Sequence, residues 1–310
     1  MIRHDSYRLL LAGPDGPLTG GLRRGGDAVA VGDWVAVEAG IVTAVLPRSS
    51  LLRRRQSISD RQQLLAANVD LTVVVAGLDR PVKPGRLQRA IALAWDAGSV
   101  PLVVLSKGDL VDDPEAARTA VAAAHPGVEV LGLAALAGDG IDAVRRAAAG
   151  RTIVMLGESG AGKSTLANAL VGSEVAATGA VRASDAKGRH TTTSRQLHLL
   201  PDGGAVIDTP GLRSLGLLVD DEAVDATFAE IDAVTEPCRF ADCAHEHEPG
   251  CAVQAAVAEG RVPAARLEAW RAMGREARAA TLRANAYALR RHGRRSSRVA
   301  REAQRRKGRD

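Results

Sequence analysis

Aromatic residues and cysteine are scarce in this chain. Phe, Trp and Tyr make up 2% of the 310 residues, so aliphatic side chains must fill most of any core. The three cysteines all fall within Cys238–Cys251, which argues against a disulfide framework and for a metal site. The chain also lacks an apolar run long enough to span a bilayer and an apolar segment near Met1 that would make a signal peptide. We therefore expect a cytoplasmic protein with no membrane partner.

Positive charge exceeds negative charge. The formal net charge is +5 and the isoelectric point is about 9.5, which suggests an anionic partner. The excess is densest near the C-terminal end, where residues 290–310 hold ten Arg and Lys side chains against the acids Glu302 and Asp310. This segment is a candidate phosphate contact for RNA.

The hydrophobic pattern predicts a multidomain α/β protein with three domains and a tail. Residues 1–65 contain closely spaced short strands without a helical period, which favours a small β-barrel. In residues 66–218, buried strands alternate with helices, which predicts a parallel sheet with helices on both faces. Residues 219–282 read as helices around the cysteines. The Arg-rich tail, residues 283–310, is too charged to fold firmly alone.

Two features of the N-terminal region allow alternative interpretations. Trp34 is able to stack a nucleobase on the barrel surface, but we favour a place in the barrel core because no second aromatic residue lies nearby. Arg53–Arg55 and Arg61 either contact phosphates or belong to a solvated linker.

A complete phosphate loop occupies residues 157–164, Gly-Glu-Ser-Gly-Ala-Gly-Lys-Ser. Its glycines let successive N–H groups face the phosphates, and the following helix presents its positive end to them. Lys163 is expected to reach the β- and γ-phosphates, and the Ser164 hydroxyl to ligate Mg²⁺. The pattern predicts a nucleoside triphosphate but does not choose the base.

Two switch segments follow the phosphate loop. Asp208 and Gly211 form a D-x-x-G pattern at a strand end, where they are expected to hold Mg²⁺ through water and to donate an N–H group to the γ-phosphate. Between the loop and this pattern, Thr192 is the favoured switch threonine and Mg²⁺ ligand. Leu212 stands where many GTPases carry a Gln that orients the attacking water, so His190 is our candidate for that role. An exposed loop histidine is the alternative.

The base is indicated by residues 106–109, Ser-Lys-Gly-Asp. In an N-K-x-D motif the Asp carboxylate accepts from guanine N1–H and N2–H₂, so Asp109 predicts guanine. Ser106 replaces the usual Asn and removes an amide that steadies the loop. Ala134 and Ala135 resemble the S-A segment whose N–H group contacts guanine O6. The predicted nucleotide-binding residues are Ser106, Lys107, Asp109, Ala134, Ala135, Gly157, Glu158, Ser159, Gly160, Ala161, Gly162, Lys163, Ser164 and Thr165.

The order of these motifs is inverted, because the guanine motif precedes the phosphate loop by about fifty residues. The inversion also places the cysteine-containing region directly after the Asp208–Gly211 segment. We therefore hypothesise that residues 212–218 pass the γ-phosphate state to that region.

The cysteines have the spacing of a zinc site. Cys238, Cys243, His245 and Cys251 provide three thiolates and one imidazole within fourteen residues, a closed tetrahedral set for structural Zn²⁺. The metal is expected to hold a loop that has little core of its own.

Taken together, these motifs resemble the RsgA family of circularly permuted GTPases. The resemblance also includes residues 32–35, 46–48, 67–70, 188–193 and 238–245. It implies an N-terminal OB barrel, a permuted GTPase core and a C-terminal zinc domain. It further implies a monomer that binds GTP, GDP and the small ribosomal subunit with its rRNA. Hydrolysis of GTP would be stimulated by the subunit, late in its maturation.

Two other functions stay open from the residues alone. One is a zinc-containing RNA-binding module whose nucleotide site is degenerate, although the intact Lys163, Ser164 and Asp109 argue against it. The other is a P-loop ATPase or kinase, which the predicted role of Asp109 disfavours.

Overall fold

The computed structural model describes most of the chain. The described residues are 3–5, 8–13, 15–22, 28–55, 62–134, 138–175, 195–208, 224, 227–235, 238–240, 243–246, 248–275 and 277–278.

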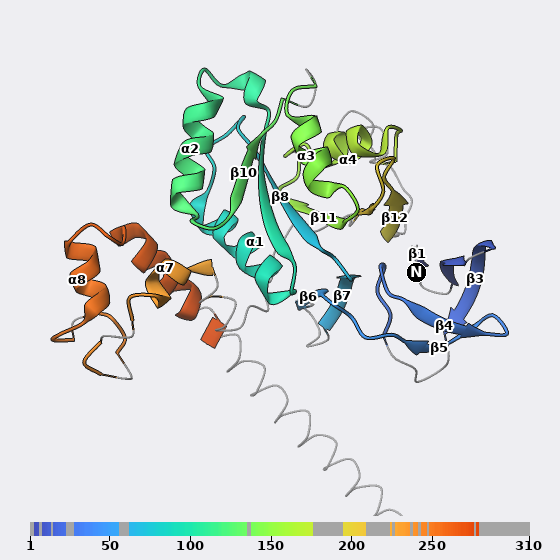
Figure 1. Cartoon of the computed structure of the whole chain (residues 1–310), viewed down its shortest axis with the longest axis horizontal. Helices are drawn as coiled ribbons and strands as arrows, with labels where there is room; N and C mark the ends of the chain where they lie inside the picture. Colours follow the sequence, from blue (N-terminus) through green and yellow to red (C-terminus); the bar gives the residue numbers. More distant parts are fainter. Residues whose placement is uncertain are drawn as a thin grey trace, which may run out of the picture.

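The centre of the molecule is a mostly parallel β-sheet (Figure 1). Its strands lie in the order β10-β9-β8-β11-β13-β12; the first five are parallel and β12 is antiparallel to β13. They span β8 (Leu71–Gly77), β9 (Val100–Ser106), β10 (Glu129–Gly132), β11 (Thr152–Gly157), β12 (Arg195–Leu199) and β13 (Ala205–Asp208). The strands are rich in Val, Leu and Ile, as expected for a sheet buried on both faces.

Helices cover both faces of this sheet. Alternate residues along each strand point to opposite faces, so Val74 packs with α1 (Pro84–Asp96) and α2 (Pro114–Ala124), whereas Val73 packs with α3 (Ile141–Ala148) and α4 (Lys163–Val171). Ile91 of α1 and Leu166 of α4 are fully buried, and each contributes roughly 1.5–3 kcal/mol of transfer free energy. The predicted α/β class is confirmed.

The first five strands form a small β-unit beside the β12 edge of the central sheet. Its strands are β1 (Arg3–Asp5), β2 (Arg8–Gly13), β3 (Gly16–Leu22), β4 (Val35–Glu38) and β5 (Ile41–Val45). They follow the order β1-β2-β3-β5-β4, with β3 and β5 parallel, which is the order of a partly open OB barrel. Leu9, Leu11, Val29 and Val42 make its core. β1 also pairs with β12, so the unit continues the central sheet.

Trp34 does not lie in the barrel core, so that prediction is wrong. In the β4–β5 pairing Val35 opposes Val45, and both pack against the core. Side chains alternate along a strand, so the neighbouring Trp34 points outward, where it is 70% exposed. The preceding Asp33 is buried instead, and its carboxylate accepts hydrogen bonds from Arg48 and from the Ala30 N–H.

A β-hairpin that the sequence did not predict follows the barrel. It consists of β6 (Leu51–Arg55) and β7 (Gln62–Ala67), and its Leu52 and Leu65 pack into the core shared with α1. Arg53–Arg55 therefore end a strand rather than form a linker, and Arg53 lies 4.0 Å from Asp96 of α1. Arg61 falls outside the described residues.

The C-terminal region is helical and packs against α1. It contains α7 (Ala229–Asp232), α8 (Ala252–Ala258) and a helical stretch over residues 264–275. Ala92 of α1 belongs to the same buried cluster as Phe228 and Leu267, and Figure 1 shows α7 and α8 on the α1 and α2 side of the sheet. Within the part of the chain that is described, no helix is long and apolar enough to cross a membrane.

Candidate nucleotide site and metal centre

The predicted phosphate loop joins the end of β11 to the start of α4. Gly157 has φ +148°, and a Cβ atom there would lie 2.2 Å from the Val75 carbonyl oxygen, so only glycine fits this approach. Lys163 begins α4 and its Nζ donates to the carbonyls of Gly157 and Glu158, at 2.8 and 2.6 Å. Its ammonium group therefore lies across the loop where it is placed to meet phosphate oxygens.

The guanine motif lies directly against the phosphate loop. The Ser106 hydroxyl at the end of β9 donates to the Ala161 carbonyl at 2.6 Å, and Ser106 is buried. The two motifs thus meet although 55 positions separate these residues. The prediction that Ser106 lacks the amide of the usual Asn, with a lower nucleotide affinity as the expected result, stays a prediction. The structure adds that the Ser106 hydroxyl itself connects the two loops.

The other described residues predicted to bind guanine, Asp109 and Ala134, follow Ser106 or are tied to the segment that follows it. Asp109 lies exposed in the short 3₁₀ helix η1 (Gly108–Leu110). The Gly108 N–H donates to the Leu133 carbonyl, which ties η1 to the segment that contains Ala134. Ala134 in turn forms an isolated bridge with Asp139. Ala135 lies outside the described residues.

The structure describes one of the four predicted catalytic residues. Asp208 ends β13, and its backbone pairs with Gln196. Because β13 and β11 are parallel, Asp208 ends at the same edge of the sheet as the phosphate loop. His190, Thr192 and Gly211 lie outside the described residues, as do residues 212–218.

Charged residues that no motif indicated also line this edge. Asp79 follows β8 and bonds Arg80 and the Lys107 ammonium, at 2.8 and 2.9 Å. The Arg80 bond, followed by the Lys107 bond, lowers the pKa of Asp79 to about 2. Glu158 of the phosphate loop pairs with Arg86 at the start of α1. For Asp79 and Arg80, the position just after the buried strand β8 was the sequence signal for a place at the nucleotide site, since ligands bind at the carboxyl ends of parallel strands.

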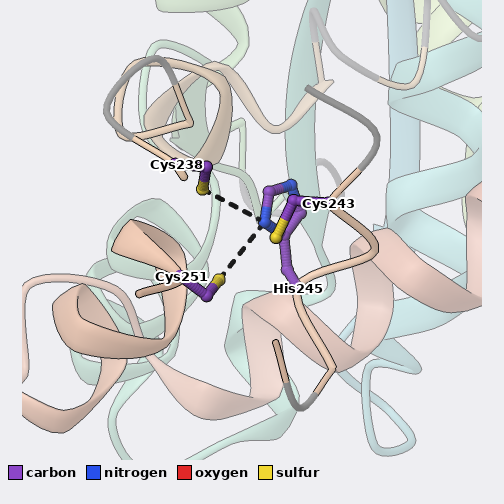
Figure 2. A group of neighbouring side chains, drawn as sticks. All are labelled: Cys238, Cys243, His245 and Cys251. Carbon is purple, nitrogen blue, oxygen red and sulfur yellow. Dashed lines mark hydrogen bonds between the residues drawn. The ribbon is translucent and has the colours of Figure 1, made fainter. Parts of the chain in front are cut away.

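The four predicted metal ligands come together in the C-terminal region (Figure 2). The ligand atoms of Cys238, Cys243, His245 and Cys251 all lie within 4.8 Å of one another. His245 Nδ1 is 3.6 Å from Cys238 Sγ and 3.4 Å from Cys251 Sγ. A tetrahedron with bonds of about 2.0–2.3 Å has edges of roughly 3.5–3.8 Å, so these residues fit one Zn²⁺ bound through Nδ1.

Neighbouring side chains hold the His245 backbone in place. His245 has φ +58°, a left-handed conformation that is uncommon for residues other than glycine. Its carbonyl accepts hydrogen bonds from Gln254 of α8 and from Arg271, and its ring lies 5.4 Å from that of Trp270. Glu248 accepts from the N–H groups on either side, those of Ala244 and Glu246.

The surroundings also favour the protonation states that bind a metal. Burial lowers the pKa of His245 and keeps its imidazole neutral. Desolvation opposes the Cys238 thiolate, but hydrogen bonds from the N–H groups of Ala252 and Val253 at the start of α8 and from the Cys243 and Cys251 thiols together lower the pKa of Cys238. Desolvation raises the pKa of Cys243 to about 11, so at neutral pH this thiol would lose its proton to solvent only when a metal binds the sulfur.

A family model described as RsgA GTPase matches residues 45–218, which is more than half of the chain. This chain belongs to the RsgA GTPase family. The resemblance seen in the motifs is thereby confirmed, and membership supports GTP hydrolysis as the activity.

Named RsgA proteins match over most of their length. The chain is 50% identical to the small ribosomal subunit biogenesis GTPase RsgA of Streptomyces coelicolor, over 80% of this chain and 70% of that protein. It is 42% identical to the RsgA of Syntrophotalea carbinolica, over 88% of this chain and 81% of that protein.

Two solved structures resemble this chain over most of its length. YjeQ from Thermotoga maritima has a TM-score of 0.68 and 26% identity, covering 89% of this chain and 96% of that one. YloQ, described as a circularly permuted GTPase, has a TM-score of 0.62 and 23% identity, covering 89% and 93% of the two chains. The YloQ likeness concerns the fold alone, and that fold is the permuted one which the motif order predicted.

Proposed function

We propose that this protein hydrolyses GTP to GDP and phosphate and that the small ribosomal subunit binds it and stimulates this hydrolysis. The protein acts late in the maturation of that subunit. The names of the relatives support the subunit as partner and the cytoplasm as location. The observation that carries the nucleotide half is the bond between Ser106 and Ala161, because it joins a guanine motif and a phosphate loop into one site.

The phosphate loop holds the triphosphate in this proposal. Backbone N–H groups of residues 158–165 face the phosphates, and Lys163 moves its ammonium from the loop carbonyls to the β- and γ-phosphate oxygens. Ser164 at the start of α4 is the hydroxyl ligand for Mg²⁺, with Thr192 as a second ligand. When bound there, Mg²⁺ would supply positive charge to neutralise the charge that develops on the transferred phosphoryl group.

The guanine loops choose the base. The Asp109 carboxylate accepts from guanine N1–H and N2–H₂, and an adenine leaves it without these donors. The stem of Lys107 covers the purine ring, and the Ala135 N–H donates to guanine O6.

Hydrolysis uses the switch residues. Asp208 would help to hold a bound Mg²⁺, the Gly211 N–H would donate to the γ-phosphate, and His190 would orient the attacking water. Water adds to the γ-phosphorus as the bond to the β-phosphate oxygen breaks, which gives GDP and phosphate.

The two other regions serve the partner. We divide the chain into a barrel (1–65), a GTPase domain (66–218), a zinc domain (219–282) and an Arg-rich tail (283–310). The Cys₃His site holds one structural Zn²⁺ with no open position, so this metal takes no part in hydrolysis. The barrel, zinc domain and tail contact the rRNA of the subunit, and the protein acts as a monomer.

Phosphate release measured while small subunits are titrated into the GTP-loaded protein tests this function. We expect slow release alone and a saturable increase with small subunits, with no comparable increase from large subunits. The Ser164→Ala variant serves as the inactive control. Absence of release under every condition, or equal stimulation by both subunits, contradicts the proposal.

A further inference from the structure

The segment that follows β8 lies beside the guanine motif. The Leu78 N–H donates to the Ser106 carbonyl at 2.9 Å, which extends the pairing of β8 and β9 beyond the strand ends. Residues 78–79 and 106–107 therefore run next to each other where the two strands leave the sheet.

The carboxylate of Asp79 occupies a space that a glycine provides. A Cβ atom on Gly77 would lie 2.5 Å from Asp79 Oδ1. The same point lies 3.5 Å from Lys107 Cδ and 3.6 Å from Ala161 Cα. The carboxylate is thus close to the stem of Lys107 and to the phosphate loop, and any side chain at position 77 would displace it.

Lys107 is held at both its backbone and its ammonium group. Its φ of +61° is left-handed, a conformation that persists for such a residue only where the surroundings impose it. Its Nζ lies 2.9 Å from Asp79 Oδ2. The lysine stem between these two fixed ends has little freedom left.

We propose that Asp79 is a positioning residue for the guanine side of the nucleotide site, which holds the Lys107 ammonium so that the lysine stem is already placed to cover the purine ring. This inference rests on the proposed function. A free lysine stem samples many rotamers, and binding must then restrict it. With Asp79 in place, most of this restriction exists before the nucleotide arrives.

This role predicts a specific kinetic pattern. Asp109 still selects the base, so the loss of Asp79 should weaken the binding of GTP and of ATP by the same factor. The ratio of the two affinities should then be unchanged. The stem contacts the base equally before and during hydrolysis, so KM rises while kcat is unchanged.

The test is a double-mutant cycle on the zinc-loaded full-length protein, with dissociation constants for a fluorescent GDP analogue. We expect Asp79→Asn to weaken binding by about threefold to tenfold, the range of an exposed charge-assisted hydrogen bond. In a Lys107→Met background the same substitution should have almost no effect. The matched control is Glu115→Gln, which removes an exposed acid paired with Arg118 on α2 and should leave affinity unchanged.

Each outcome decides. An undiminished Asp79→Asn effect in the Lys107→Met background overturns the inference, because Asp79 then acts without Lys107. If Asp79→Asn does not fold, Lys107→Met and Arg118→Gln decide: we expect the first to weaken GDP binding and the second to leave it within about twofold, since Arg118 pairs with Glu115 on α2 rather than with Asp79. The reverse pattern contradicts the inference. A wild-type protein that binds no guanine nucleotide overturns the proposed function as well.

Discussion

The nucleotide site and the metal centre are held in place by different means. The nucleotide loops leave the ends of strands in a sheet that is packed on both faces, so their positions follow from a large core. The metal ligands lie beside short elements, such as α7 with four residues and α8 with seven. The comparison shows that removal of a ligand should be a binding problem at the first site and a folding problem at the second.

Loss of the metal should have the largest effect. Cys251 is a predicted ligand, and its sulfur also accepts from the Gln254 N–H at the start of α8. We expect Cys251→Ser to abolish zinc binding and most hydrogen-exchange protection in residues 224–277, since structural zinc contributes on the order of 10 kcal/mol. GDP affinity should change less than about twofold.

The control for this variant is Glu259→Gln, which removes an exposed acid paired with Arg261 in the same region. It should keep both zinc and protection. A GDP affinity that falls with the zinc content would contradict the claim that the nucleotide site is held in place without the metal. The two sites would then belong to one folding unit.

The reciprocal substitution is Ser164→Ala. It removes the predicted Mg²⁺ ligand, so Mg²⁺-dependent GTP affinity should fall by about a hundredfold, or roughly 2.7 kcal/mol. Zinc content, measured by release to a metal indicator, should be unchanged. A parallel fall in zinc content would contradict the independence of the two sites.

His125 lies where the central sheet domain meets the C-terminal region, and its titration provides a further prediction. It is buried at the end of α2, and burial, with the charge of Arg266 in the C-terminal region, lowers its pKa from 6.5 to about 4. In the unfolded chain His125 therefore binds a proton below about pH 6.5, whereas in the folded chain it binds one only below about pH 4. Stability falls as pH falls through this window, by roughly 2 kcal/mol between pH 7.5 and 5.

Denaturant unfolding at the two pH values measures this effect. The wild-type protein should lose roughly 2 kcal/mol of its free energy of unfolding through His125 between pH 7.5 and 5. His125→Gln should lack this part of the loss. An identical pH dependence in both proteins would show that His125 titrates in the folded state as freely as in the unfolded chain.

The smallest effect is expected from Ser106→Ala. This substitution leaves the buried Ala161 carbonyl without its hydroxyl donor and should cost about 1 kcal/mol of nucleotide affinity, or roughly fivefold. Isothermal titration with GDP provides the measurement, and Ser106→Thr, which keeps the hydroxyl, is the control. Equal affinities for Ser106→Ala and wild type would mean that the bond does not hold the loops for binding.

The sequence predicted those features that depend on local pattern. The phosphate loop lies between β11 and α4, as its pattern predicted, because glycine spacing and apolar runs act over a few residues. The four clustered metal ligands were predictable from spacing for the same reason.

Features that depend on distant contacts were missed. The bond from Ser106 to Ala161 and the ion pair of Asp79 with Lys107 join different loops, which no local pattern reports. Trp34 was misplaced because its direction depends on the register of β4 against β5. The β6–β7 hairpin was not predicted, because Arg53–Arg55 suggest an exposed segment although the neighbouring Leu52 is buried in the core.

Competition between nucleotides tests the central claim most directly, namely that the inverted motifs build one guanine site. A fluorescent GDP analogue bound to the zinc-loaded protein with Mg²⁺ is displaced by unlabelled GTP, GDP or ATP, and the displacement constants are compared. The account predicts that GTP and GDP displace the analogue while ATP is weaker by about a hundredfold or more, because adenine lacks the N1–H and N2–H₂ donors that the Asp109 carboxylate accepts from in guanine. Equal displacement by ATP and GTP would contradict it.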